Sequence, residues 1–223
     1  MKPSNAELRD IFDGAAARYD DVTSAYAVAR RIEFAQEHAQ GRTLEVGAGT
    51  GQIAGALMRE HEVVATDISL NMVAAMRAKG IEATACDAES LPFPDASFDT
   101  VVSAECIYYL DHPQRFLAEA NRVLKPGGVL ILTSASAITS WYDRARSALR
   151  AFGVKSMYFD DPVHTFPSLT KLRTLAIESG FEITHTDRFV ILPNARLDKF
   201  NRLLEKTPLA ALAAFTGLVA RKT

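Results

Sequence analysis

The stretch that decides the fold reads Thr43-Leu44-Glu45-Val46-Gly47-Ala48-Gly49-Thr50-Gly51. A short apolar run ends in glycines on alternate positions, which predicts a buried strand that turns sharply into a helix starting near Gln52. Glycine accepts a positive φ and lets a ligand approach the peptide plane, and the first amides of the helix point outward as unpaired donors. The stretch therefore predicts a nucleotide-type pocket, and a turn whose glycines serve only for packing is the other interpretation.

Further strand-like runs follow along the chain, and helix-like segments with polar faces separate most of them. The runs lie at 43–47, 62–67, 81–86, 100–105, 127–134, 181–191 and 214–221, after a helical stretch at 4–39. This alternation predicts an α/β fold: a doubly wound, Rossmann-like, mostly parallel sheet of seven strands, with N-terminal helices and lid insertions. The last two runs follow the main alternation, so one of them is expected to be an antiparallel edge strand.

Length and composition suit one domain, because 223 residues with 48% hydrophobic and 23% charged side chains are ordinary for a globular protein. No apolar run approaches the length of a membrane span and the N-terminus lacks a secretory signal, so a cytoplasmic protein is expected. Cys86 and Cys106 lie at predicted strand positions of a parallel sheet and are expected to be reduced thiols. Nucleic acid is not an expected partner, because the net charge is −2 and no strongly basic surface with interleaved aromatics appears.

Acidic residues end or precede the turns of the first three predicted strands. Asp67 ends the second run, 20 positions after Gly47, where a carboxylate can accept hydrogen bonds from ribose hydroxyls. Asp87 ends the third run, and Glu45 lies inside the first. Each acid alone fits a helix cap or a solvated loop, but together, after a glycine-rich turn, they indicate a nucleoside pocket.

In four motifs the sequence resembles the class I S-adenosylmethionine-dependent methyltransferases, in the small-molecule, type 11-like branch that includes quinone, polyketide and sterol methyltransferases. The motifs are Leu44 to Gly51, Ala65 to Met72, Cys86 to Asp99 and Val123 to Gly128, and Phe12 to Asp20 resembles the family's N-terminal helix. The resemblance implies S-adenosylmethionine as cofactor, S-adenosylhomocysteine as product and a small-molecule acceptor. No metal site is expected, and the oligomeric state is left open.

The resemblance also implies roles for single residues. Those expected around the methionine part of the cofactor are Tyr19, Glu45, Gly47, Ala48, Gly49 and Gly51, with Glu45 ordering the loop and Tyr19 reaching the carboxylate. Those expected around the nucleoside are Asp67 on the ribose, Ile68 and Met72 beside the adenine, and Asp87 and Ala88 at its amino group. Ala104 is expected near the sulfonium.

A sulfonium methyl is already activated, so the protein mainly has to exclude water and align the nucleophile, and no catalytic residue is assigned. The candidates for a base or for the wall of the acceptor site are Tyr108, Tyr109, His112, Trp141 and His164, and the start of a helix is the other interpretation of His112. The aromatic and apolar content of the insertions at 136–167 and 194–212 predicts a hydrophobic or aromatic acceptor.

The domain plan expected from these observations is one methyltransferase domain at 1–223. It comprises a helical cap at 1–40, a cofactor-binding core at 41–135, a lid at 136–167, and a C-terminal helix and edge strands at 168–223 with the helical insertion 194–212. That insertion alternates apolar and basic residues at helical spacing. It is predicted either to pack on the domain as a lid or to rest on an anionic membrane.

Two other functions compete with methyl transfer. An NAD-dependent oxidoreductase also has a glycine-rich turn and an acid about 20 residues later, but its fingerprint needs glycine where this chain has Gln52. A non-catalytic domain that binds S-adenosylmethionine as a sensor or an assembly subunit fits the same motifs.

Overall fold

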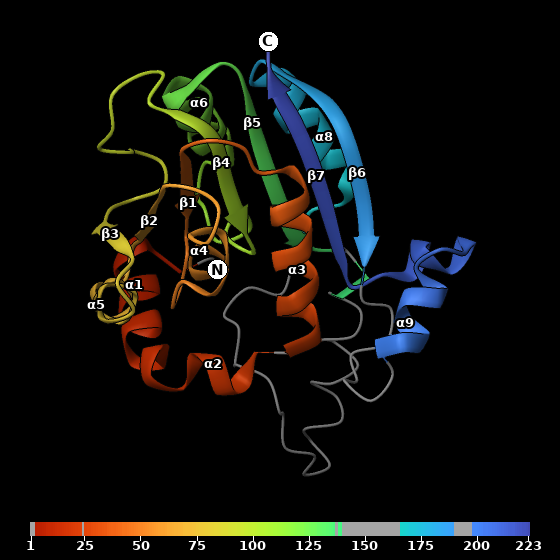
Figure 1. Ribbon diagram of the computed structural model, residues 1–223, viewed down its shortest axis with the longest axis horizontal. Helices are drawn as coiled ribbons and strands as arrows, with labels where there is room; N and C mark the ends of the chain where they lie inside the picture. The colour runs from red at the N-terminus through yellow and green to blue at the C-terminus, as the bar shows by residue number, and fades with distance from the viewer. Residues whose placement is uncertain (1–2, 24, 137, 140–165, 190–197) are drawn as a thin grey trace.

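The computed structural model describes residues 3–23, 25–136, 138–139, 166–189 and 198–223. At its centre lies a seven-stranded sheet in the order β3-β2-β1-β4-β5-β7-β6 (Figure 1). The strands are β1 (Thr43–Val46), β2 (Val63–Asp67), β3 (Glu82–Ala85), β4 (Phe98–Ala104), β5 (Leu124–Ala135), β6 (Phe181–Phe189) and β7 (Phe215–Lys222). Neighbouring pairs from β3 across to β5 are parallel, which confirms the doubly wound α/β prediction.

The antiparallel strand is β7, which pairs with β5 on one side and with β6 on the other. The expected antiparallel strand is therefore present as the inner strand of the edge pair. The edge itself is β6. Central β1 and β2 are buried along their whole length, whereas β6 mixes buried and exposed positions because no further strand covers its outer side.

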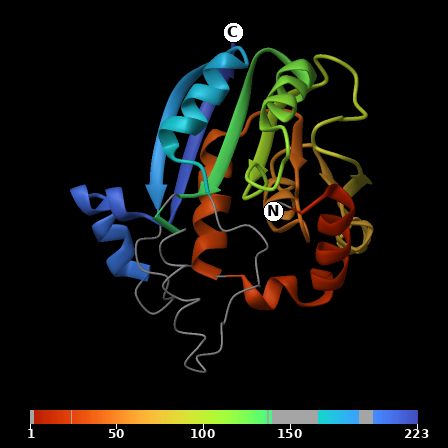
Figure 2. The ribbon, with the colours of Figure 1, turned by 180° about the vertical axis from the view of Figure 1, so that it is seen from behind.

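Helices cover both faces of the sheet (Figures 1 and 2). One face carries α3 (Ala25–His38), α4 (Gln52–Leu57) and α5 (Leu70–Ala78), whose apolar side chains share a buried cluster with Ala65, Val102 and Ile131. The other face carries α6 (Pro113–Val123) and α8 (Leu169–Glu178), packed on Val46, Val64 and Val101. Each strand of the centre is thus buried on both sides, as its apolar sequence requires.

The remaining helices lie toward the carboxyl edge of the sheet (Figure 1). They are α1 (Asn5–Ala15), the short 3₁₀ turn η1 (Ala16–Arg18), α2 (Tyr19–Val22), α9 (Asp198–Leu204) and the 3₁₀ turn η3 (Pro208–Leu212). A capping box formed by Ser4 and Glu7 starts α1. None of the helices in the described ranges has both the length and the apolar run that a bilayer crossing requires.

Residues 140–165 and 190–197 lie outside the described part of the chain, and so do residues 24 and 137. Most of the predicted lid at 136–167 falls there, together with Trp141 and His164. The first residues of the insertion at 194–212 fall there as well.

Candidate functional site

A cavity opens at the carboxyl ends of β1, β2 and β4. Its wall combines backbone of the glycine turn, acids that follow the strands, and apolar side chains of the N-terminal helices. The lining residues are Asn5, Leu8, Phe12, Tyr19, Val46, Gly47, Gly49, Thr66, Asp67, Ile68, Cys86, Asp87, Ala88, Ala104, Glu105, Cys106, Tyr109 and Leu110. The cavity therefore lies at the edge where open α/β sheets bind their ligands.

The turn between β1 and α4 passes through left-handed backbone at Gly47 and at Gly51, with φ of 70° and 79°. A Cβ at Gly47 would lie 2.6 Å from the Sγ of Cys106, so this glycine lets the loop approach the end of β4. A Cβ at Gly51 would lie 2.5 Å from the Cδ1 of Ile81. Gly47 thus lines the cavity, whereas Gly51 lies behind it and serves for packing.

Glu45 lies beneath the turn, 2% exposed, and its Oε2 accepts a hydrogen bond from the amide of Ala54 over 2.7 Å. The helix α4 starts after Gly51, which has no side chain to cap it, so the acceptor comes from β1 instead. Burial raises the pKa of Glu45 to about 8, although the Ala54 amide acts in the opposite direction. With Ala48 and Ala104, Glu45 lines a smaller adjoining hollow.

Asp67 ends β2 at the wall of the cavity. Its Oδ2 accepts from the amide of Gly49 over 2.8 Å, and its Oδ1 accepts from the amide of Ser69 over 2.9 Å. Burial raises the pKa of Asp67, and the amide hydrogen bonds partly oppose that shift. Ile68 follows in the cavity wall, whereas Met72 lies on the inner face of α5 and is fully buried. The side chain of Ser69 caps that helix by accepting a hydrogen bond from the Met72 amide.

Asp87 follows β3 on the same side of the cavity. Its Oδ1 accepts from the amide of Glu89 over 2.9 Å, and its Oδ2 accepts from the Nδ2 of Asn5 on α1 over 2.7 Å. The neighbouring Ala88 also lines the cavity. Asp67 and Asp87 thus lie on two adjacent strand ends, as the sequence predicted.

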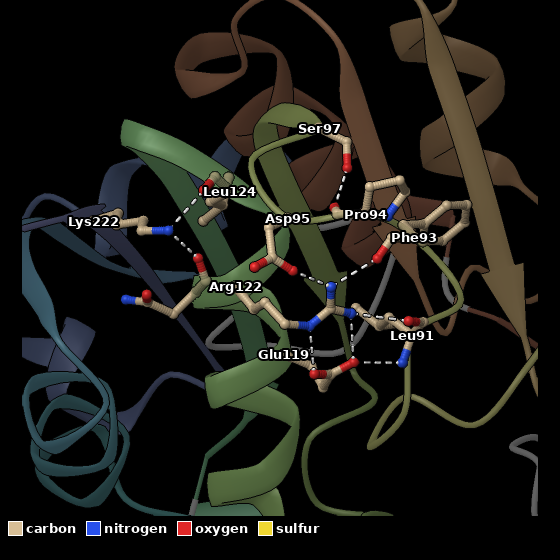
Figure 3. Close-up of polar contacts among 10 residues, drawn as sticks. Leu91, Phe93, Pro94, Asp95, Ser97, Glu119, Arg122, Leu124 and Lys222 are labelled. Carbon is tan, nitrogen blue, oxygen red and sulfur yellow. Dashed lines mark hydrogen bonds and ion pairs between the residues drawn. The ribbon is translucent and has the colours of Figure 1, made fainter.

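Arg122 of α6 holds the loop that continues from Asp87 (Figure 3). Its guanidinium donates to the carbonyl oxygens of Phe93 over 2.7 Å and Leu91 over 3.0 Å. The same group forms ion pairs with Asp95 and Glu119, each at 2.8 Å. The planar guanidinium suits this arrangement because its N–H donors point in several fixed directions. Its contacts hold in place a loop that has no strand or helix structure of its own.

The N-terminal helices close the cavity through side chains that contact distant parts of the chain. Asp13 accepts from the hydroxyl of Ser69 over 2.5 Å and from the amide of Asn71 over 3.0 Å. On α2, Asp20 accepts from the hydroxyl of Thr50 over 2.5 Å. Tyr19 lies over Gly49, where an added Cβ would meet the tyrosine ring at 3.3 Å.

The opposite end of the cavity follows β4, where Glu105 has a left-handed φ of 58°. Its carboxylate accepts from the Oγ1 of Thr133 over 3.0 Å and from the hydroxyl of Tyr108 over 3.3 Å. Burial raises the pKa of Glu105. A non-glycine residue in this strained conformation beside a cavity is typical of a functional site.

Aromatic rings continue the wall beyond Glu105. Tyr109 lines the cavity, and its ring meets that of Phe12 edge to face at 5.2 Å between centroids. Tyr108 packs behind it, 4.6 Å from Tyr109 and 4.8 Å from Phe166. His112 precedes α6, and its amide donates to Glu89 over 2.7 Å, so it starts the helix and does not line the cavity.

Comparison with known proteins gives one consistent family. Residues 44–132 match the model described as a methyltransferase domain. The ubiquinone/menaquinone biosynthesis C-methyltransferase UbiE of Pseudomonas putida is 29% identical over 208 residues, covering 79% of this chain and 81% of the relative.

Solved structures agree in fold. An S-adenosylmethionine-dependent methyltransferase of Thermotoga maritima, described as a possible histamine N-methyltransferase, has a TM-score of 0.74 at 23% identity and covers 97% of this chain and 100% of its own. A phosphoethanolamine N-methyltransferase 2 of Haemonchus contortus was solved in complex with phosphomonomethylethanolamine and S-adenosylhomocysteine. It has a TM-score of 0.65 at 19% identity, and the match covers 99% of this chain and 60% of the Haemonchus chain.

The domain match spans the glycine turn, both strand-end acids and β4, on a sheet of the same fold. Residues 44–132 match a methyltransferase domain, and the comparisons together support a class I S-adenosylmethionine-dependent methyltransferase. These matches favour methyl transfer over the NAD-dependent alternative.

In this methyltransferase most of the predicted site residues gather around one cavity. Those in its wall or in the adjoining hollow are Tyr19, Glu45, Gly47, Ala48, Gly49, Asp67, Ile68, Asp87, Ala88, Ala104 and Tyr109. Those placed elsewhere are Gly51, Met72, Tyr108 and His112. Sequence reasoning missed Asn5, which stands in no pattern that predicts a ligand. It also missed Glu105, although this acid ends the predicted strand 100–105 and the strand-end pattern used for Asp67 and Asp87 could have found it.

Proposed function

We propose that the methyltransferase transfers the methyl group of S-adenosylmethionine to a small aromatic or hydrophobic acceptor by in-line displacement. The observation that carries this proposal is a single cavity with two different ends. Buried Asp67 at the end of β2 and half-buried Asp87 after β3 lie at one end, and Glu105 lies at the other, in a wall that also holds Phe12, Tyr109 and Leu110.

The polar end suits the nucleoside of the cofactor. Asp67 is held by two backbone amides, so its carboxylate is already fixed where it would accept from the ribose hydroxyls. Asp87 and the amide of Ala88 would meet the adenine edge. Gly47 and Gly49 would let the methionine part approach the backbone, with Tyr19 above it. When bound, S-adenosylmethionine supplies the activated methyl.

Glu105 is the group proposed to act on the acceptor. A phenol or enol becomes nucleophilic at carbon or oxygen as its hydroxyl loses a proton, and a carboxylate with a raised pKa accepts that proton more readily near neutral pH. Thr133 and Tyr108 hold the carboxylate in one position. The similarity to a quinone C-methyltransferase supports an aromatic acceptor and transfer to carbon.

Calorimetry with S-adenosylmethionine, S-adenosylhomocysteine and NAD tests the cofactor first. The first two should bind and NAD should not, and failure of both adenosyl compounds to bind would refute the proposal. Transfer of labelled methyl to phenols and quinols, compared with small amines, then tests the acceptor. Label in amines alone would contradict the acceptor class, and tight binding without transfer to any acceptor would favour the non-catalytic alternative.

A further inference from the structure

Residues 198–212, which form α9 and η3, project from the rest of the described molecule. Figures 1 and 2 show α9 and η3 beside the end of the sheet, away from its core. The segment joins the carboxyl end of β5, because the amide of Ser136 donates to the carbonyl of Ala214 over 2.7 Å. It therefore lies at the edge of the sheet to which the cavity also opens.

Large apolar side chains on this projection face outward. The exposed fractions are 50% for Phe200, 61% for Leu203, 48% for Leu209 and 49% for Leu212. In the rest of the described chain, only Met58, Leu70 and Ile177 are large apolar residues of comparable exposure, and they lie apart, just after α4, on α5 and on α8. Four such residues within 13 positions are a concentration that a free surface rarely carries.

The inward contacts of α9 and of Glu205, which follows it, are polar, which reverses the usual arrangement. Asn201 is fully buried, and the side chain of Glu205 is only 7% exposed. Glu205 forms an ion pair with Arg30 at 3.2 Å and accepts from the hydroxyl of Tyr26 over 3.2 Å. Polar contacts with α3 thus fix α9 in an orientation that turns Phe200 and Leu203 toward the outside.

The charges that remain on the outside are all basic. Between Lys199 and Leu212 the sequence holds a single acid, Glu205, and the contact with Arg30 takes it inward. Arg202 forms an ion pair with Glu33 at 2.6 Å. Lys199 and Lys206 are exposed, and neither forms an ion pair with any residue that the structure describes.

We infer that this surface, the α9 patch of Phe200, Leu203, Leu209 and Leu212 with Lys199 and Lys206, docks on an anionic lipid bilayer. Leucine and phenylalanine side chains enter the boundary between headgroups and acyl chains, while lysines beside them meet anionic headgroups. The bilayer is the partner whose charge and apolar interior both complement the patch. As a consequence that rests on the proposed function, a hydrophobic acceptor would reach the cavity from the same side.

A second copy of the chain fits the patch less well. A symmetric dimer through this surface would bring its lysines face to face, and like charges across an interface oppose association. Sedimentation of the full chain over a concentration range, without lipid, distinguishes this case. Self-association that Phe200→Ser abolishes would overturn the inference.

Co-sedimentation of the full chain with vesicles tests the inference directly. Vesicles of phosphatidylcholine mixed with phosphatidylglycerol should retain the protein, and vesicles of phosphatidylcholine alone should not. Lys199→Ala and Lys206→Ala should each weaken binding about fivefold at low salt. The double variant Phe200→Ser and Leu203→Ser should lose binding at every salt concentration tested.

Ile177→Ser is the matched control, because Ile177 is 56% exposed on α8 and lies outside the patch. It should leave vesicle binding unchanged. S-adenosylmethionine binding by calorimetry should be the same in all variants, which separates loss of docking from misfolding and from failure of the proposed function. Equal retention by neutral and anionic vesicles, no retention by either, or full retention of the double variant would each refute the inference.

Discussion

The amide of Gly49 donates a hydrogen bond of 2.8 Å to the carboxylate of Asp67. This contact joins the glycine turn after β1 to the acid that ends β2, 18 residues later in the chain. The second carboxylate oxygen accepts from Ser69, the capping residue of α5. The position of Asp67 is therefore set by two backbone segments, and a bound ribose need not order it.

Asp67→Asn should weaken S-adenosylmethionine binding by about 1–3 kcal/mol, because it replaces charged hydrogen bonds with neutral ones in a buried site. Calorimetry measures the change. Glu60→Gln is the control, since Glu60 is an exposed acid that does not line the cavity. Equal affinity of wild type and Asp67→Asn would remove Asp67 from the cofactor site.

Gly51→Ala should lower the free energy of unfolding by about 2 kcal/mol or more. The substitution forces alanine into left-handed backbone and places its Cβ against Ile81 and Met76. Gly14→Ala, where a Cβ would have no neighbour within 4 Å, should instead stabilise α1 by about 0.5–1 kcal/mol. Urea unfolding of both variants gives the comparison, and equal effects would contradict the packing role of Gly51.

Glu45 should make stability depend on pH. The pKa of Glu45 is about 8 in the folded protein, whereas its ordinary value, which applies to the unfolded chain, is 4.5. Between pH 4.5 and pH 8 the folded state therefore holds a proton that the unfolded state has lost. Stability should therefore fall as pH rises from 4.5 to 8, by on the order of a few kcal/mol. Urea unfolding at pH 5 and pH 8 should show a smaller fall for Glu45→Gln. The exposed variant Glu178→Gln should keep the wild-type fall.

Glu105→Gln should lower kcat at least about 100-fold if the carboxylate accepts the acceptor's proton. The affinity for S-adenosylmethionine should change little. Because a base works only when deprotonated, wild-type activity should fall as pH drops below the raised pKa of Glu105, and the variant should lack this limb. Partial rescue by Glu105→Asp would distinguish chemistry from packing. A kcat unchanged in Glu105→Gln would argue that the acceptor binds elsewhere, and Glu82→Gln on β3 controls for surface charge.

Arg122→Lys should destabilise the protein by about 2 kcal/mol, because lysine cannot replace the fork that meets two carbonyl oxygens and two carboxylates. Affinity for S-adenosylmethionine should fall severalfold, since the loop begins at Asp87. Arg115→Lys on the exposed side of the same helix should change neither quantity. Urea unfolding and calorimetry measure them, and an Arg122→Lys variant with wild-type values would show that the loop needs no such anchor.

Much of the fold could be predicted from the sequence because its signals are local. Apolar runs bounded by polar segments predicted the strands, and alternation with helices predicted a parallel sheet. The turn at Gly47 and the acids Asp67 and Asp87 predicted which edge carries the site, because the carboxyl ends of parallel strands meet there.

The faces of single helices were harder to predict. Met72 stands at helical spacing within a motif, but the spacing does not say that this residue of α5 is completely buried and does not line the cavity. On α9 the apolar residues would be expected to face inward, yet Asn201 and Glu205 occupy the inner side. Contacts with Tyr26 and Arg30, about 175 residues away, decide that orientation.

The sequence by itself determined the succession of strands and helices along the chain and the residue types at the strand ends that line the cavity, since both follow from short-range periodicity and from glycine's backbone freedom. Only the tertiary structure decided that Asn5 meets Asp87, that Glu105 turns toward the cavity through a left-handed residue, and that Phe200 faces outward. Each of these depends on a partner far along the chain. Contacts between residues so distant in sequence form only when the whole sheet and its helices pack together, so the local sequence does not determine them.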